Sequence, residues 1–212
     1  MNRDGTLPLI AAGAEALGLR LDGEQLRLLD RHVALLLKWN RSINLTAITE
    51  PSEVVEKHVL DSLALVPFVP RGTLLDVGTG AGFPGLPVRI ARPDLALVLV
   101  DSVQKKVAFL KSALAELRLA NVRALAMRLS GDPAREGLSL VDGAVARAFA
   151  APRPWLRLAG NYVRPGGMVL CMLGARDEAP PVEGELELTG EHEYRLPFSG
   201  AQRRLRMYRR RE

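Results

Sequence analysis

The sequence contains one cysteine, Cys171, and three histidines among its 212 residues. A single cysteine cannot form an intrachain disulfide, and so few cysteines and histidines argue against a structural zinc site. No apolar run approaches the roughly 20 residues that a membrane-spanning helix needs, and the N-terminal region lacks a basic segment followed by an apolar stretch. We therefore expect a cytoplasmic protein with no metal, no disulfide and no membrane segment.

Lysine is also scarce. Only five of the 29 basic residues are lysine and the rest are arginine, and the net charge is +5. A basic protein attracts polyanions such as RNA, although a general arginine bias of the proteome explains the composition equally well. Apolar residues make up 48% of the chain and charged residues 25%, which indicates a globular core.

The first third of the chain has the pattern of helices. Apolar residues recur at helical spacing from Leu7 to Leu17, and Gly18 is expected to end that helix. Asp22 is predicted to cap a long second helix, and Pro51 to begin a third. We expect residues 1–65 to form an N-terminal helical cap on a core formed by residues 66–212.

After residue 72, short apolar runs alternate with helical patterns. We expect strands at 73–77, 95–100, 122–127, 141–147 and 167–173, and helices at 84–91, 102–119, 130–137 and 151–163. This order predicts an α/β fold with a mostly parallel, doubly wound sheet. Between residues 185 and 211, glutamates and arginines alternate with apolar residues. That alternation predicts two antiparallel edge strands whose charges compensate each other across a hairpin.

A glycine-rich loop follows the first expected strand, with the sequence Asp76-Val77-Gly78-Thr79-Gly80-Ala81-Gly82-Phe83-Pro84-Gly85. Its glycines allow a sharp turn and a close approach to a ligand. Residues 80–85 match the dinucleotide fingerprint G-x-G-x-x-G. From Asp76 onward, the same residues give D-x-G-x-G-x-G, which resembles motif I of the class I methyltransferases that use S-adenosylmethionine.

Two acidic residues bear on the choice of ligand. A carboxylate at Asp76 would repel a dinucleotide pyrophosphate, but it suits the sulfonium and ammonium groups of S-adenosylmethionine, directly or through water. Asp101 ends the second expected strand, where a carboxylate can accept both hydroxyls of a ribose in either cofactor class. Helix capping is the alternative explanation for both residues. Two carboxylates at adjacent strand ends, beside a glycine loop, favour S-adenosylmethionine.

Five blocks between about residues 25 and 175 carry a family resemblance. They are Leu37-Lys38-Trp39-Asn40 with Ile43-Asn44-Leu45-Thr46; Lys57-His58-Val59-Leu60-Asp61-Ser62-Leu63; the glycine loop; Asp101-Ser102 with Lys105, Lys106, Phe109 and Leu110; and Arg147-Ala148-Phe149-Ala150. In this combination the chain resembles the bacterial 16S rRNA (guanine-N7) methyltransferases, also called glucose-inhibited division protein B. The resemblance implies a class I Rossmann-like fold. It also implies methyl transfer from S-adenosylmethionine to N7 of one guanine in the decoding-region loop, with 16S rRNA in the small ribosomal subunit or an assembly intermediate as partner.

The resemblance also maps cofactor contacts onto Gly78, Phe83, residues 129–130 and Arg147. With the loop and strand-end residues, the expected cofactor-binding set is Asp76, Gly78, Gly80, Gly82, Phe83, Asp101, Leu129, Ser130 and Arg147. Two positions depart from the family pattern. This chain has Arg128-Leu129-Ser130 where the family usually has Arg-Ala-Glu, and Leu173 where a lysine tends to precede the glycine.

Guanine N7 has a lone pair and no proton, so its methylation needs no general base. Catalysis would then depend on alignment and desolvation, in agreement with a sequence that offers no convincing nucleophile–base pair. We expect no catalytic acid or base, and we expect Arg147, Lys57 and His58 to contact the substrate. Cys171 is predicted to be a buried core residue, and the protein is expected to be a monomer.

Some alternatives concern single residues. Arg147 can form a structural ion pair instead, and His58 with Asp61 can form a pair on a helix surface. Trp39 and Asn44 are expected to pack the cap onto the core. Two alternatives concern the whole chain. An NAD(P)-dependent oxidoreductase fits the literal fingerprint but lacks a Tyr-x-x-x-Lys motif or a hydride-site histidine, and the other alternative is a non-catalytic RNA-binding protein with a Rossmann domain.

Overall fold

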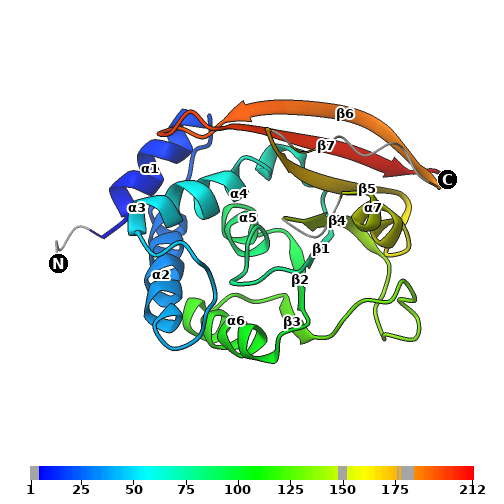
Figure 1. Cartoon of the computed structure of the whole chain (residues 1–212), viewed down its shortest axis with the longest axis horizontal. Coiled ribbons are helices and arrows are strands. Elements are labelled where there is room, and N and C mark those ends of the chain that lie inside the picture. The colour runs from blue at the N-terminus through cyan, green and yellow to red at the C-terminus, as the bar shows by residue number, and fades with distance from the viewer. Residues whose placement is uncertain (1–4, 148–151, 176, 178–183) are drawn as a thin grey trace.

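The computed structural model describes residues 5–147, 152–175, 177 and 184–212. Within these residues, one seven-stranded sheet has the order β3-β2-β1-β4-β5-β7-β6 (Figure 1). The strands are β1 (Thr73–Val77), β2 (Ala96–Asp101), β3 (Val122–Ala126), β4 (Val141–Ala146), β5 (Val163–Gly174), β6 (Leu186–Arg195) and β7 (Gln202–Arg210).

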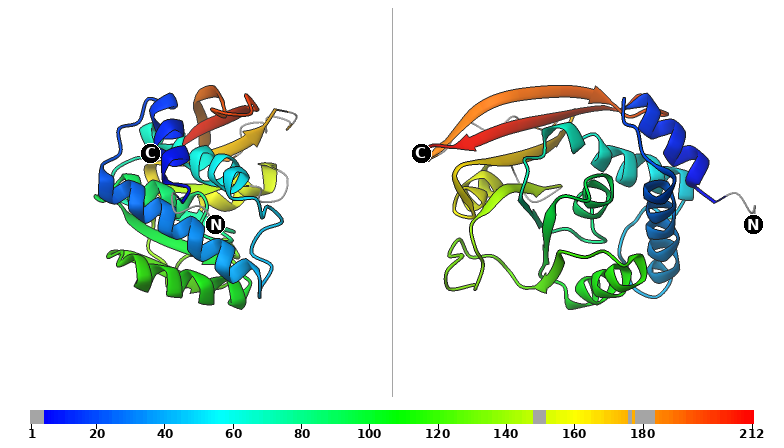
Figure 2. Two further views of the ribbon diagram at one scale, coloured as in Figure 1. Left: turned by 90° about the vertical axis from the view of Figure 1, so that its left-hand side faces the viewer. Right: turned by 180° about the vertical axis from the view of Figure 1, so that it is seen from behind.

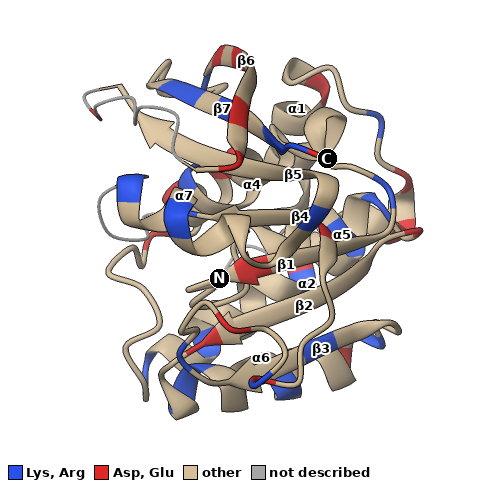
Figure 3. Ribbon diagram, turned by 90° about the vertical axis from the view of Figure 1, so that its right-hand side faces the viewer, with Lys and Arg blue, Asp and Glu red and all other residues tan. Residues whose placement is uncertain are grey.

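Strands β1 to β5 are parallel to one another. Strand β7 lies antiparallel to both β5 and β6, so β6 at the edge runs in the same direction as the parallel strands. The predicted doubly wound sheet and the predicted C-terminal hairpin are therefore confirmed. Figure 3 shows acidic segments of β6 beside basic segments of β7, and the predicted charge compensation includes ion pairs of Arg206 with Glu191 and of Arg210 with Glu185.

Helices cover both faces of the sheet (Figure 2). They are α1 (Leu7–Ala16), α2 (Gly23–Asn40), α3 (Pro51–Val54), a π-helical segment (Val55–Leu60), α4 (Asp61–Leu63), a 3₁₀ turn (Val66–Phe68), α5 (Gly85–Ala91), α6 (Gln104–Leu117) and α7 (Pro152–Gly160). Helices α1 to α6 share one hydrophobic cluster with one face of the sheet. Helix α7 packs in a second cluster on the other face.

Helix α2 follows directly from its sequence. Asp22 caps it, because its side chain accepts a hydrogen bond from Gln25 N while the Gln25 side chain accepts one from Asp22 N. Its apolar stripe packs into the hydrophobic cluster that it shares with the sheet, where Leu29, Val33 and Leu36 are at most 1% exposed. The N-terminal helices and the sheet thus share a continuous core, which holds the N-terminal segment against the glycine loop.

The structure corrects two expectations. The helix expected at 130–137 is wrong, because Gly131 and Gly137 take φ values of +97° and +67° and residues 133–137 form a turn instead of a helix. Asn44 is exposed and does not pack the cap. Asn40 supports the loop instead, since its Oδ1 accepts hydrogen bonds from the amides of Leu45 and Thr46.

None of the helices in the described ranges is both long enough and apolar enough to cross a bilayer. Across the same ranges, no group of three or more His, Cys, Asp or Glu residues is arranged to bind a metal ion.

Candidate functional site

The glycine loop lies at the carboxyl end of β1 and is held from beneath by Asp76. The Asp76 side chain has no exposed surface. Its Oδ2 accepts hydrogen bonds from Thr79 Oγ1 at 2.6 Å and from Gly85 N at 2.8 Å. The first amide of helix α5 and the middle of the loop are thereby fixed to one carboxylate. Asp76 therefore shapes the loop through hydrogen bonds. Because its carboxylate is fully buried, it can act on a ligand only electrostatically, without direct contact.

That buried charge is electrostatically unusual. Burial raises the pKa of Asp76 to about 6, although the hydrogen bonds from Thr79 and Gly85 oppose the shift. Among the described residues, Asp76 Oδ1 has no hydrogen-bond partner. A buried carboxylate oxygen without a partner is costly, and a nearby cationic group would relieve that cost.

Asp101 connects the loop to the next strand. It ends β2, as predicted, and its Oδ2 accepts a hydrogen bond from Gly80 N at 2.9 Å. Its Oδ1 accepts one from Val103 N at 2.9 Å. Lys106 Nζ lies 4.0 Å from Oδ2. Because each carboxylate oxygen can accept more than one hydrogen bond, Asp101 keeps capacity for the hydroxyls of a ribose.

The loop glycines face different surroundings. Gly80 has φ +59°, and a Cβ added there would meet none of the described residues within 4 Å, so among these residues its backbone borders open space. Gly82 has φ +91°, and a Cβ there would lie 2.4 Å from Leu86 Cδ1. Gly82 therefore allows helix packing, whereas Gly80 leaves room beside the loop for a ligand.

Phe83 forms the floor between the loop and the N-terminal helices. Its ring is 3% exposed and stacks on His32 and on His58, with centroids 4.8 Å and 4.9 Å away. The His32 Nε2 lies 2.8 Å from Ala81 O, and because that carbonyl can only accept, Nε2 is the donor. Burial lowers the pKa of His32 to about 4, so this histidine is neutral near pH 7. It was not singled out from the sequence as a site residue.

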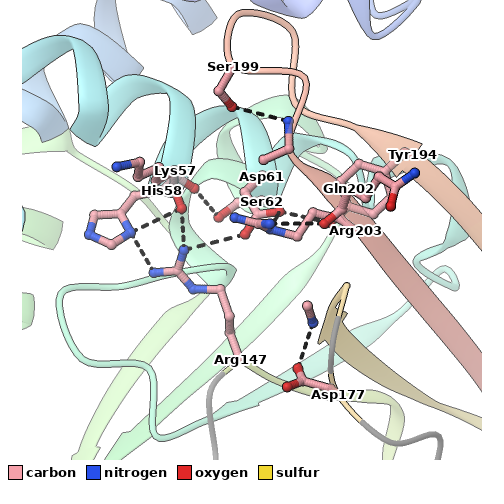
Figure 4. Close-up of polar contacts among 12 residues, drawn as sticks. Lys57, His58, Asp61, Ser62, Arg147, Asp177, Tyr194, Ser199, Gln202 and Arg203 are labelled. Carbon is pink, nitrogen blue, oxygen red and sulfur yellow. Dashed lines mark hydrogen bonds and ion pairs between the residues drawn. The ribbon is translucent and has the colours of Figure 1, made fainter.

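Arg147, at the end of β4, meets the π-helical segment. Its Nη1 donates to Lys57 O at 2.7 Å and its Nη2 to His58 Nδ1 at 2.8 Å. The guanidinium carbon lies 5.5 Å from the Phe83 ring centroid. Figure 4 shows the guanidinium between His58 and Asp61. The structure thus brings Arg147, His58 and Phe83 together.

These contacts fix the state of His58. Its Nδ1 accepts from Arg147, so the proton is on Nε2, which lies 2.9 Å from Thr46 Oγ1. Burial and the Arg147 charge lower the pKa of His58 to about 3. A helix-surface pair of His58 with Asp61 is wrong, because Asp61 is buried and both residues interact with Arg147 instead.

Lys57 contacts Arg147 through its backbone carbonyl and not through its side chain. Its carbonyl accepts from Arg147, whereas its ammonium pairs with Glu53 on the preceding helical turn and is partly exposed. The structural ion pair considered for Arg147 is present, because its Nη1 lies 3.7 Å from Asp61 Oδ2. Residues 148–150 of the fifth sequence block lie outside the described residues.

The segment after β3 places the carboxylate of Glu136 beside Ser130, which the sequence did not predict. Leu129 packs with Val77 and Val100, beside the ends of β1 and β2. The Ser130 hydroxyl donates to Glu136 Oε1 at 2.7 Å, and Tyr162 Oη donates to Glu136 Oε2 at 2.6 Å. Glu136 was not identified from the sequence, because the turn that brings it beside Ser130 has no clear sequence pattern.

Cys171 is buried on β5, as predicted, and burial raises the pKa of its thiol to about 12. It therefore stays protonated and is unsuited to nucleophilic chemistry. Trp39 packs its edge against Phe109, with centroids 5.8 Å apart, which confirms the expected packing of this residue onto the core.

The family model for rRNA small subunit methyltransferase G matches residues 25–206. The chain belongs to this family. Curated relatives with that name include one from Myxococcus xanthus, 49% identical over 205 residues, which cover 94% of each chain. One from Anaeromyxobacter dehalogenans is 49% identical over 201 residues, which cover 92% of this chain and 93% of the relative. The chain is therefore a methyltransferase, and the literal dinucleotide fingerprint in its loop does not indicate an oxidoreductase.

Solved structures agree with this assignment at the level of the fold. An O-methyltransferase from Bacillus cereus in complex with SAH has a TM-score of 0.62 at 14% identity, over 96% of this chain and 100% of that one. An O-methyltransferase from Streptomyces achromogenes in complex with SAM has a TM-score of 0.59 at 16% identity, over 95% and 96% of the two chains. The predicted class I methyltransferase fold is confirmed.

Proposed function

We propose that this protein transfers a methyl group from S-adenosylmethionine to N7 of one guanine in the decoding-region loop of 16S rRNA. The observation that carries the proposal is the carboxylate-held glycine loop in a chain that belongs to the rRNA small subunit methyltransferase G family. Its relatives carry the name of ribosomal RNA small subunit methyltransferases, which supports the small ribosomal subunit or its assembly intermediate as the partner.

The described residues fit S-adenosylmethionine on three grounds. Gly80 borders open space that a side chain would fill. Asp101 stands beside it with free acceptor capacity for the ribose hydroxyls. Asp76 has a buried carboxylate oxygen with no hydrogen-bond partner among the described residues, and its charge favours a cationic ligand through space. When bound, this cofactor supplies an electrophilic methyl group on a positively charged sulfur.

The remaining residues orient the reactants. In this proposal Gly78, Gly82 and Phe83 form the loop side of the cofactor site, and Leu129 and Ser130 contact the cofactor near the end of β3. Arg147 holds the cofactor or the guanine through its guanidinium. Lys57 and His58 remain the other proposed substrate contacts, and both also accept hydrogen bonds from that guanidinium.

Guanine N7 carries its own lone pair and no proton, so the chain needs no group that removes one. His58 is neutral and already hydrogen-bonded through both ring nitrogens, and the Cys171 thiol is buried. The protein acts by alignment and by exclusion of water, which suffice for large accelerations when the geometry is held closely.

Basic side chains on helices α6 and α7 contribute to the attraction for RNA. Helix α6 carries Lys105, Lys106 and Lys111, and helix α7 carries Arg153 and Arg157 (Figure 3). Phosphate contacts of this kind give affinity that falls steeply with salt. We further propose that residues 1–65 act as a cap on the core of residues 66–212, and that the protein works as a cytoplasmic monomer without a metal.

Two measurements test the proposal. Calorimetric titration with S-adenosylhomocysteine and with NADH should give binding of the first ligand only. Incubation with methyl-labelled cofactor and unmethylated small subunits should label ribosomal RNA. A protein that binds the nucleoside but leaves all ribosomal RNA unlabelled would be a binding protein and not this enzyme.

A further inference from the structure

A buried carboxylate joins the C-terminal hairpin to Arg147. Asp61 begins α4 and is 5% exposed. Its Oδ1 accepts a hydrogen bond from Tyr194 Oη at 2.8 Å and lies 3.6 Å from Arg203 Nε, while its Oδ2 lies 3.7 Å from Arg147 Nη1. Tyr194 on β6 and Arg203 on β7 are cross-strand partners, so the hairpin presents both groups to the same carboxylate (Figure 4).

The hairpin holds the π-helical segment at a second point. Glu56, which is 7% exposed, accepts hydrogen bonds from the backbone amides of Phe198 and Ser199 in the turn between β6 and β7. Burial acts to raise the pKa of Glu56, but the two amides, the Ser199 side chain and the Lys57 charge together outweigh it and lower the pKa. The segment from Glu56 to Asp61 is therefore fixed at both ends by the hairpin.

Within the part of the chain that the structure describes, three acceptors that hold the Arg147 guanidinium belong to this segment. They are Lys57 O, His58 Nδ1 and Asp61 Oδ2. Burial raises the pKa of Asp61, and Arg147, Tyr194 and Arg203 together oppose that shift. Loss of one of these partners would raise the pKa of Asp61 further and remove a contact that holds the carboxylate in place, which weakens the anchor of Arg147.

We propose that Asp61, Tyr194 and Arg203 are positioning residues, through which the C-terminal hairpin fixes the Arg147 guanidinium beside Phe83. The proposal rests on the proposed function for one point only, namely that Arg147 faces the cofactor and the RNA. Tyr194 and Arg203 themselves need no contact with either reactant.

The first test measures the position of the Arg147 side chain and does not depend on enzymatic activity. Tyr194→Phe removes one hydroxyl and keeps the ring, so Asp61 loses one hydrogen bond. We expect the Arg147 side-chain Nε–H resonance in NMR spectra to shift or broaden in Tyr194→Phe and more strongly in Asp61→Asn. Thr189→Val is the matched control, because it removes a hydroxyl that donates to Met207 O in the same hairpin, away from Asp61. An unchanged Arg147 resonance in Tyr194→Phe would overturn the proposal.

The second test is a double-mutant cycle on methyl transfer to small subunits. We expect kcat/KM to fall about tenfold in Tyr194→Phe, because a small displacement of an aligning group is costly, and to stay near wild type in Thr189→Val. In the Arg147→Ala background, Tyr194→Phe should have no further effect on kcat/KM while it still lowers the melting temperature.

The outcomes separate the two proposals. A full additional loss of kcat/KM from Tyr194→Phe in the Arg147→Ala background would show that Tyr194 acts elsewhere. A lower melting temperature with unchanged kcat/KM would make the hairpin structural only. Failure of the wild-type protein to methylate small subunits would refute the proposed function instead, and the NMR test of positioning would still stand.

Discussion

Substitution of Gly80 is expected to block the proposed cofactor site with little damage to the rest of the fold. The φ of Gly80 is +59°, and a Cβ built there meets no atom of the described residues within 4 Å. Gly80→Ala therefore adds no clash with the residues that the structure describes. Its cost to folding is the left-handed backbone strain of an alanine, about 1–2 kcal/mol. The added methyl instead enters the space in which we place the cofactor.

We expect Gly80→Ala to weaken S-adenosylhomocysteine binding at least tenfold, which corresponds to about 1.4 kcal/mol. The assay is isothermal titration calorimetry at a fixed pH near 7, with urea unfolding of the same samples. Gly82→Ala is a poor substitute, because its methyl would lie 2.4 Å from Leu86 Cδ1 and disturb the packing of α5.

Gly18→Ala supplies the matched control. Gly18 follows α1, has φ +74°, and has equally open surroundings. It should lose about the same 1–2 kcal/mol of stability as Gly80→Ala and keep wild-type affinity. If Gly80→Ala also binds S-adenosylhomocysteine with wild-type affinity, the open space beside the loop is not the cofactor site and the assignment of the loop is wrong.

Two further predictions concern pH. His32 has a folded-state pKa of about 4 against 6.5 for the free group, so the unfolded chain binds a proton first and stability is lost as pH falls below about 6.5. Between pH 7 and pH 5 the protonation of His32 in the unfolded chain should lower the free energy of unfolding of the wild type by about 2 kcal/mol. In urea unfolding, the free energy of unfolding of the wild type minus that of His32→Phe should fall by that amount. A difference between the two proteins that is constant with pH would contradict the prediction. The pKa of Asp76 is about 6 and deprotonation favours a cation, so S-adenosylmethionine affinity should rise about tenfold from pH 5 to pH 7. In Asp76→Asn the calorimetric affinity should not show that rise, and an identical pH profile would remove Asp76 from the electrostatics of the site.

The sheet was predictable because its strands are short apolar runs. Residues 73–77 and 95–100 give clear strands, and the glycine loop between the first strand and α5 is where we propose that the ligand binds. The C-terminal hairpin was predictable because charged and apolar residues alternate along it. Since crossovers between parallel strands are right-handed, only a few strand orders are possible for the rest of the sheet. Helix 130–137 failed because local composition does not reveal how Glu136 and Tyr162 organise that turn.

The site was only partly predictable. The loop residues and Asp101 follow from their place at strand ends. The partners of Arg147 do not, because Tyr194 and Asp61 are 133 residues apart and meet only when the hairpin joins the sheet edge. His32 was missed for a similar reason, since its position on the buried stripe of α2 suggests a core residue and not a partner for the loop carbonyl of Ala81.

The central claim is tested most directly by mapping the methyl group. Small subunits that lack the modification would be incubated with the purified protein and labelled S-adenosylmethionine, and the RNA would be digested and analysed by mass spectrometry. The account predicts a single 7-methylguanine in the decoding-region loop of 16S rRNA. A label on a ring carbon, on a ribose oxygen or on another macromolecule would contradict it.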